Sequence, residues 1–144
     1  MQEPSNASNW RYKELTADER DERRLNLLTE QIIGCAYQVS NTLGSGFLEK
    51  VYENALVYEL RKTGIHIEQQ KGINVFYDGF LVGEFFADMI VENSVIIELK
   101  TVKLLDENQL AQCLNYLKAI DLKICLLINF AKPRIEIKRI VNNF

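Results

Sequence analysis

Residues 85–100 read FFADMIVENSVIIELK, and this stretch constrains the fold more than any other part of the chain. Two apolar runs flank Glu92-Asn93-Ser94, a triplet that is typical of a turn. Each run is apolar at consecutive positions, as expected for a strand that is covered on both faces. We therefore predict an antiparallel hairpin of two strands, about residues 81–91 and 95–100, of which residues 85–91 and 95–100 are central and covered.

Three ionisable side chains interrupt these apolar strands: Asp88, Glu98 and Lys100. If residues 92–94 form a three-residue loop, Asp88 lies directly opposite Glu98, with Cβ atoms about 5 Å apart. Lys100 follows Glu98 by two residues and shares its face, at a separation of about 6.8 Å. Because an isolated buried carboxylate destabilises a fold by several kcal/mol, this cluster needs a physical reason.

The hairpin alone leaves two interpretations of the cluster open. Paired carboxylates repel each other unless one is protonated or a cation lies between them. Ligand sets made of oxygen suit Mg²⁺ or Mn²⁺, and a nearby lysine can activate an attacking water or stabilise the charge that develops on a phosphorane. Alternatively, Lys100 forms a salt bridge with Asp88 or Glu98 that only fixes the strand register.

The periodicity of the remaining chain places this hairpin in an α/β domain. Apolar spacings of three and four predict helices over about residues 25–43, 47–62 and 107–120. Strands are expected near residues 65–77 and 124–128 and beyond Pro133. The order helix, helix, three or four antiparallel strands, helix, strand, strand indicates a mixed sheet flanked by helices.

Charge and composition divide the chain and narrow its class. Residues 1–24 are rich in both charges, so we expect a charged tail or a loosely docked helix there, and a folded domain over 25–144. Apolar residues make up 47% of the sequence and the net charge is -3, which argues against a surface coated in positive charge.

The three cysteines include no C-x-x-C pair, which argues against a disulfide scaffold or a cysteine zinc site. With no export or membrane-spanning segment, we expect a cytoplasmic protein with no membrane partner.

Two predicted helices carry further groups of polar residues. In the helix over 47–62, Glu49 and Tyr52 occupy neighbouring surface positions, and Glu53 follows Glu49 by one turn. The helix over 107–120 carries a polar stripe made of Gln109, Gln112 and Tyr116. Each group alone is typical of an exposed helix surface.

Taken in chain order, these residues resemble the PD-(D/E)XK nuclease superfamily, and within it the small bacterial branch named for the motif G-x-x-E-x-x-Y. The matching elements, over about residues 25–143, are Gly46-x-x-Glu49-x-x-Tyr52, Asp88, Glu98-Leu99-Lys100, Gln112-x-x-x-Tyr116, Asn129-Phe130 and Lys138-Arg139. The E-x-K triplet is common by chance, whereas the ordered series is specific. Two positions depart from the pattern: Gln109 stands where relatives often carry His, and Ala131 stands where a Gly usually follows Asn-Phe.

The resemblance implies a restriction-endonuclease-like αβββαβ core with Mg²⁺ (or Mn²⁺) as its cofactor. It implies that Asp88 and Glu98 bind the metal, with Glu49 as an additional acidic ligand and the Leu99 carbonyl as a further one. It also implies that Lys100 is catalytic, together with Asp88 and Glu98. The residues that would position the substrate are Gln112, Tyr116 and Tyr52.

The function implied by the resemblance is metal-dependent hydrolysis of phosphodiester bonds in DNA. Nucleic acid would be the partner, and a homodimer or a protein partner is left open. A basic stretch near the C-terminus would hold phosphates or form a solvated edge strand: Lys132, Arg134, Lys138 and Arg139. The alternative function is a non-catalytic nucleic-acid- or partner-binding module on the same fold, since a fold does not by itself establish an activity.

Overall fold

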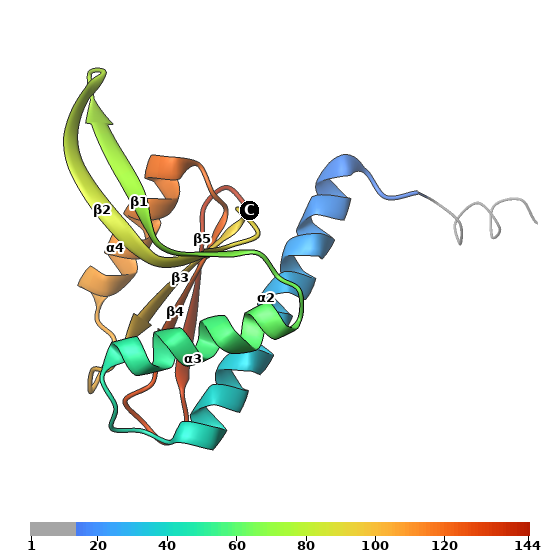
Figure 1. Cartoon of the computed structure of the whole chain (residues 1–144). Coiled ribbons are helices and arrows are strands. Elements are labelled where there is room, and N and C mark those ends of the chain that lie inside the picture. The colour runs from blue at the N-terminus through green and yellow to red at the C-terminus, as the bar shows by residue number, and fades with distance from the viewer. Residues whose placement is uncertain (1–13) are drawn as a thin grey trace, which may run out of the picture.

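A five-stranded mixed sheet with helices on both faces makes up residues 14–144, the part of the chain that this computed structural model describes (Figure 1). In chain order the elements are α2 (Ala17–Leu43), α3 (Glu49–Lys62), β1 (Ile67–Tyr77), β2 (Phe80–Val91), β3 (Val95–Lys100), α4 (Glu107–Ile120), β4 (Ile124–Asn129) and β5 (Glu136–Val141). The strands are ordered β1-β2-β3-β4-β5, and only β3 and β4 pair in parallel, across the connection that contains α4. The predicted αβββαβ order and mixed sheet are confirmed.

Each face of the sheet has its own apolar core. Helices α2 and α3 cover one face, where Ile97 and Leu99 of β3 are buried among their side chains. Helix α4 covers the other face, where Ile96 packs against its buried residues. Because side chains alternate along a strand, Glu98 and Lys100 follow Ile96 and face α4.

The loop between β2 and β3 has the predicted register. Val91 pairs with Val95 and Met89 with Ile97. Glu92 and Asn93 both have φ near 52°, and the Ser94 N–H donates to the Val91 carbonyl at 2.9 Å. The turn is therefore closed by its own backbone, as the three-residue loop requires.

The side chains of β2 that point to the same side of the strand change from one core to the other at Asp88. Met89 is buried in the core under α2 and α3, whereas Ala87, two residues earlier, is buried against α4. Opposite this point, Gln70 of β1 has φ 50° and makes no pair in the ladder. The outer part of the β1–β2 hairpin therefore lies beside α4 (Figure 1).

The expectation that residues 85–91 of β2 are covered on both faces is wrong for Phe85 and Phe86. Only Met89–Val91 pair with β3, so the preceding residues have β1 as their sole strand partner. Phe85 and Phe86 are 43% and 61% exposed. An apolar run on both faces thus does not distinguish a covered strand from a projecting hairpin.

Helix α2 begins earlier than the apolar stripe predicts, at Ala17 instead of Leu25. Thr16 caps it, with the Glu19 N–H donating to the Thr16 hydroxyl at 3.1 Å and the Thr16 N–H donating to the Glu19 carboxylate at 2.8 Å. Asp21 pairs with Lys123 at 2.8 Å, so part of the predicted tail is helix attached to the domain. Residues 1–13 of that tail lie outside the described residues. Across 14–144, the helices include none with the length and apolar character to cross a bilayer.

Candidate active site

The carboxylates of Asp88 and Glu98 lie where the ladder between β2 and β3 ends. Beyond the pair Met89↔Ile97, the Leu99 N–H donates to Asp88 Oδ2 at 2.7 Å, and the Asp88 N–H donates to Glu98 Oε1 at 3.2 Å. Each carboxylate therefore takes the place of a backbone carbonyl on the neighbouring strand. Both acids are held by backbone groups at one point, each through a single oxygen.

Burial raises the pKa of both carboxyl groups. The pKa of Glu98, which is 7% exposed, is raised to about 8 by desolvation and then by the charge of Asp88. The pKa of Asp88 is raised by desolvation and by the charge of Glu53, against the lowering effect of the Leu99 N–H. Two carboxyl groups that resist ionisation together indicate a site that favours a cation or a proton between them.

Lys100 ends β3 next to these acids without pairing with either. Its charge offsets part of the rise in both pKa values, yet no salt bridge in residues 14–144 includes it. Its backbone carbonyl accepts from the Phe130 N–H at 2.9 Å, which holds the end of the strand. The ammonium group therefore lies near the acids without being used as a register-fixing salt bridge.

Glu53, not Glu49, is the acid of α3 that connects to this point. Glu53 is 4% exposed, and its carboxylate accepts hydrogen bonds from the side chains of Gln69 at 2.8 Å and Gln70 at 3.0 Å. The Gln70 amide also reaches Asp88 Oδ1 at 3.5 Å. Glu49, the first residue of α3, is exposed. Helical spacing alone does not predict this role of Glu53; the signal is its position among the apolar residues of the helix face that packs on the sheet.

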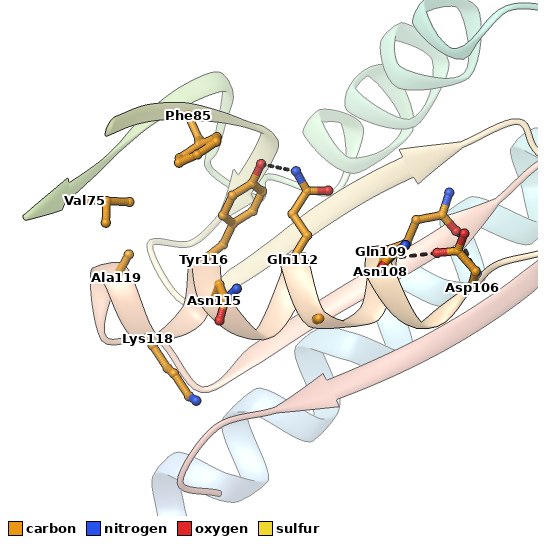
Figure 2. A pocket seen from close by; sticks show the side chains of 11 residues that line it. Val75, Phe85, Asp106, Asn108, Gln109, Gln112, Asn115, Tyr116, Lys118 and Ala119 are labelled. Carbon is orange, nitrogen blue, oxygen red and sulfur yellow. Dashed lines mark hydrogen bonds between the residues drawn. The ribbon is translucent and has the colours of Figure 1, made fainter. Parts of the chain in front are cut away.

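Gln112 and Tyr116 lie together on α4, as the helical spacing predicts. The Gln112 amide donates to the Tyr116 hydroxyl at 2.7 Å (Figure 2). Desolvation and then the charge of Glu98 raise the pKa of Tyr116, which indicates that this phenol lies near the acids. Gln109, the first member of the predicted stripe, instead forms the capping box of α4 with Asp106.

Tyr52 has a structural position that does not suit the predicted contact with substrate. Its side chain is fully buried and stacks on Phe130 with ring centroids 4.5 Å apart. Its hydroxyl donates to the Gly44 carbonyl at 2.7 Å and accepts from the Phe47 N–H at 3.2 Å. Because the side chain has no exposed surface, it stabilises the loop before α3 and cannot touch a substrate directly.

Asn129 fixes the segment that follows Lys100. It is fully buried. Its side chain accepts from the N–H groups of Val102 and Ala131 and donates to the Val102 carbonyl and to Glu136. This set of bonds joins the ends of β3 and β4, so the Asn-Phe pair of the motif supports the end of β3 that carries Lys100.

The basic residues near the C-terminus do not form one continuous strip. Lys138 and Arg139 are consecutive in β5, so their side chains lie on opposite faces. Arg139 donates to Asn26 of α2 at 2.7 Å and packs over Phe144. Lys132 and Arg134 are exposed in the loop between β4 and β5.

The donors at this point suit a hard divalent cation. In the part of the chain that the structure describes, no three His, Cys, Asp or Glu side chains lie close enough to form a complete metal site. Mg²⁺ commonly binds through one or two carboxylates and keeps several waters. Asp88 and Glu98 provide two such carboxylates, and a cation would offset both the desolvation and the charge of Asp88 that raise the pKa of Glu98.

The sequence matches a known family, and the fold resembles a solved structure. The sequence model described as "PD-(D/E)XK nuclease superfamily" matches residues 26–140. A crystal structure of SSO0001 has a TM-score of 0.52 and 21% identity, and the match covers 87% of this chain and 63% of that one. An alkaline exonuclease from Laribacter hongkongensis has a TM-score of 0.45 and 12% identity, with 80% and 82% covered. No curated protein matches the sequence significantly.

Proposed function

Because the chain belongs to the PD-(D/E)XK nuclease superfamily, we propose that it is a Mg²⁺- or Mn²⁺-dependent nuclease that hydrolyses phosphodiester bonds in DNA. One observation carries the proposal. Asp88 and Glu98 meet at the end of a strand ladder, and the charge of Lys100, which forms no salt bridge within residues 14–144, offsets part of the rise in the pKa of both acids. The motif Gly46-x-x-Glu49-x-x-Tyr52 supports placing the chain in the G-x-x-E-x-x-Y branch.

In this proposal Asp88 and Glu98 hold the cation, and the Leu99 carbonyl is a third oxygen donor. A bound divalent cation acts as a Lewis acid on the phosphate and favours ionisation of an attacking water. Lys100 orients that water and stabilises the negative charge that develops on the phosphoryl oxygens, because its ammonium is near the acids but not paired with them. The hydrogen bonds of Leu99 and Asp88 N–H fix the two carboxylates before the substrate arrives.

We assign Glu53 a positioning role in place of the ligand role expected of Glu49. Its carboxylate holds Gln69 and Gln70, and Gln70 extends to Asp88. Glu53 thus acts on the site through β1. Glu49, one turn earlier on α3, has no such connection among the described residues.

Gln112 and Tyr116 form the side of the site on α4. Their mutual hydrogen bond fixes the phenol near Glu98, where it can donate to a phosphate oxygen of the substrate. The expected cytoplasmic location and the homodimer or protein partner stay predictions.

A cleavage assay tests the proposal. Purified full-length protein is incubated with end-labelled linear, circular and single-stranded DNA in Mg²⁺, Mn²⁺ or EDTA, beside the Lys100→Ala variant. We expect cleavage by the wild type in metal only, and at least about a hundredfold slower cleavage by the variant, because electrostatic stabilisation by one positioned group accounts for such a factor. If the wild type cleaves none of these DNAs faster than Lys100→Ala does, the proposal that the protein hydrolyses DNA is wrong.

A further inference from the structure

A groove on the exposed side of α4 shares Gln112 and Tyr116 with the candidate active site. It has a volume of about 820 Å³ and runs between α4 and the outer part of the β1–β2 hairpin. Gln112 and Tyr116 line its middle, with Asp106 and Gln109 toward the start of α4 and Ala119 further along the helix (Figure 2). Gln112 and Tyr116, which are proposed to contact the substrate, therefore also line a groove. The proposed cleavage step itself assigns no role to the rest of this groove.

The hairpin provides an aromatic wall for this groove. Phe85 projects from β2 toward α4, with its ring centroid 5.5 Å from that of Tyr116 (Figure 2). Phe85 remains 43% exposed although it contacts Tyr116, so one part of its ring is available to a ligand. Val75 of β1 extends the same apolar wall.

The opposite wall carries side-chain amides. Four residues of α4 with amide side chains line the groove: Asn108, Gln109, Gln112 and Asn115. Amide groups both donate and accept hydrogen bonds, and they match the donor and acceptor edges of nucleobases. An aromatic face opposite a row of amides is therefore complementary to a flat heterocycle with polar edges.

The charges in the groove favour an uncharged group over a phosphate. Asp106 and Lys118 are the charged residues that line it among those described. They lie near opposite ends of α4 and have opposite signs. A phosphate in the middle of the groove would find no excess of positive charge to bind it. An uncharged base needs no such charge, so it can bind there without an electrostatic cost.

We propose that this groove binds an unpaired nucleobase of the DNA strand whose phosphate lies at Asp88 and Glu98, so that the enzyme prefers single-stranded DNA or frayed ends. The inference rests on the proposed function for the position of that phosphate. Stacking on Phe85 requires an exposed face of the base, which a base inside a duplex does not offer because its neighbours cover both faces. Amide contacts from α4 then hold the base by its edge.

Equilibrium binding without turnover tests the groove separately from catalysis. Fluorescence anisotropy with full-length protein in EDTA, and again in Ca²⁺, compares a labelled single-stranded oligonucleotide with the same sequence as a blunt duplex. We expect the single strand to bind more tightly. We also expect Phe85→Ala to weaken single-strand binding about 5- to 150-fold, the range for loss of one base–aromatic stack, with little effect on the duplex.

The matched control is Phe86→Ala. Phe86 is the next residue of β2 and is more exposed, at 61%, but it does not line the groove, so its removal should leave binding unchanged. A second variant, Ala119→Trp, fills the groove from the exposed side of α4 and should weaken single-strand binding even if Phe85→Ala disturbs the hairpin. Thermal unfolding of each variant shows whether the fold is intact.

Three results would overturn the inference. The blunt duplex could bind as tightly as the single strand, or Phe85→Ala could match Phe86→Ala while Ala119→Trp has no effect. The third is that Phe85→Ala abolishes self-association without changing oligonucleotide binding, which would assign the groove to a second copy of the chain. Failure of cleavage with intact single-strand binding would instead contradict the proposed function alone.

Discussion

Glu98 is deeply buried and lies close to a second carboxylate. In the metal-free protein, the free energy of unfolding therefore depends on whether Glu98 is protonated. Its pKa rises from 4.5 to about 8 on folding, first through desolvation and then through the charge of Asp88. Between these two pH values the folded state binds more protons than the unfolded state, so the free energy of unfolding falls as pH rises. Above about pH 8 the stabilising contribution of the protonated form is lost.

Glu98→Gln should remove this pH dependence. The amide cannot ionise, so in EDTA the variant should lose less stability than the wild type between pH 5 and pH 9, by an amount on the order of a few kcal/mol. Urea unfolding at a series of pH values measures the difference. Identical pH dependence in both proteins would show that Glu98 ionises freely in the fold.

A second residue-level prediction separates the two acids of α3. Glu53→Gln should lower the cleavage rate at least about tenfold, because the amide holds Gln69 and Gln70 less well than the carboxylate does and Asp88 loses part of its support. Glu49→Gln, one turn away on the exposed surface, is the matched control and should stay within about twofold of the wild type. A large loss in Glu49→Gln with none in Glu53→Gln would restore Glu49 as the acid of the site.

Helix α3 shows why the sequence predicts some elements of the site and not others. Asp88, Glu98 and Lys100 stand out in the sequence because charged residues interrupt apolar strands, where burial makes charge costly. In a helix, Glu49 and Glu53 lie on similar faces, and only the packing of α3 against β1 decides which of them is buried. The length of β3 could be predicted because a turn precedes its continuous apolar run, and the bounds of α4 because its apolar residues have a clear helical period. The exposure of Phe85 and Phe86 could not, since it depends on where β3 stops pairing with β2.

The loop that leads into α3 depends on Tyr52. Tyr52→Phe removes the hydroxyl that joins the Gly44 carbonyl to the Phe47 N–H and leaves both groups short of a partner. We expect a loss of about 1 to 2 kcal/mol in the free energy of unfolding, with the cleavage rate of the folded protein within about threefold of the wild type. Tyr58→Phe, at a residue that is 64% exposed, is the control and should be neutral in urea unfolding. A selective loss of activity in stable Tyr52→Phe would instead give Tyr52 a role in the site.

The arrangement of the whole molecule brings the site together from separate layers. Helices α3 and α4 lie on opposite faces of the sheet (Figure 1). The sheet provides Asp88, Glu98 and Lys100, α3 supports Asp88 through β1, and α4 adds Gln112 and Tyr116. The sequence predicts this αβββαβ order because the periodicity changes clearly between helices and strands. It does not predict the turn of β2 at Asp88 from one core to the other, which follows from the unpaired Gln70 across the ladder.

Binding of a cation to this assembled site should stabilise the whole fold. Adding Mg²⁺ or Mn²⁺ should raise the midpoint of thermal unfolding of the wild type, because a ligand that binds only the folded state adds stability that grows with the logarithm of one plus the ratio of its free concentration to Kd. Asp88→Asn should remove the shift while keeping the fold, since the Asn oxygen still accepts from the Leu99 N–H. Equal shifts in the wild type and in Asp88→Asn would place the cation elsewhere.

A crystal structure of the protein grown with Mn²⁺, with anomalous data collected above the manganese edge, locates the cation without reference to activity. We predict one anomalous peak in contact with carboxylate oxygens of both Asp88 and Glu98, and the Lys100 ammonium free of either acid. A map with no peak there, and with Lys100 bonded to both carboxylates, would contradict the account.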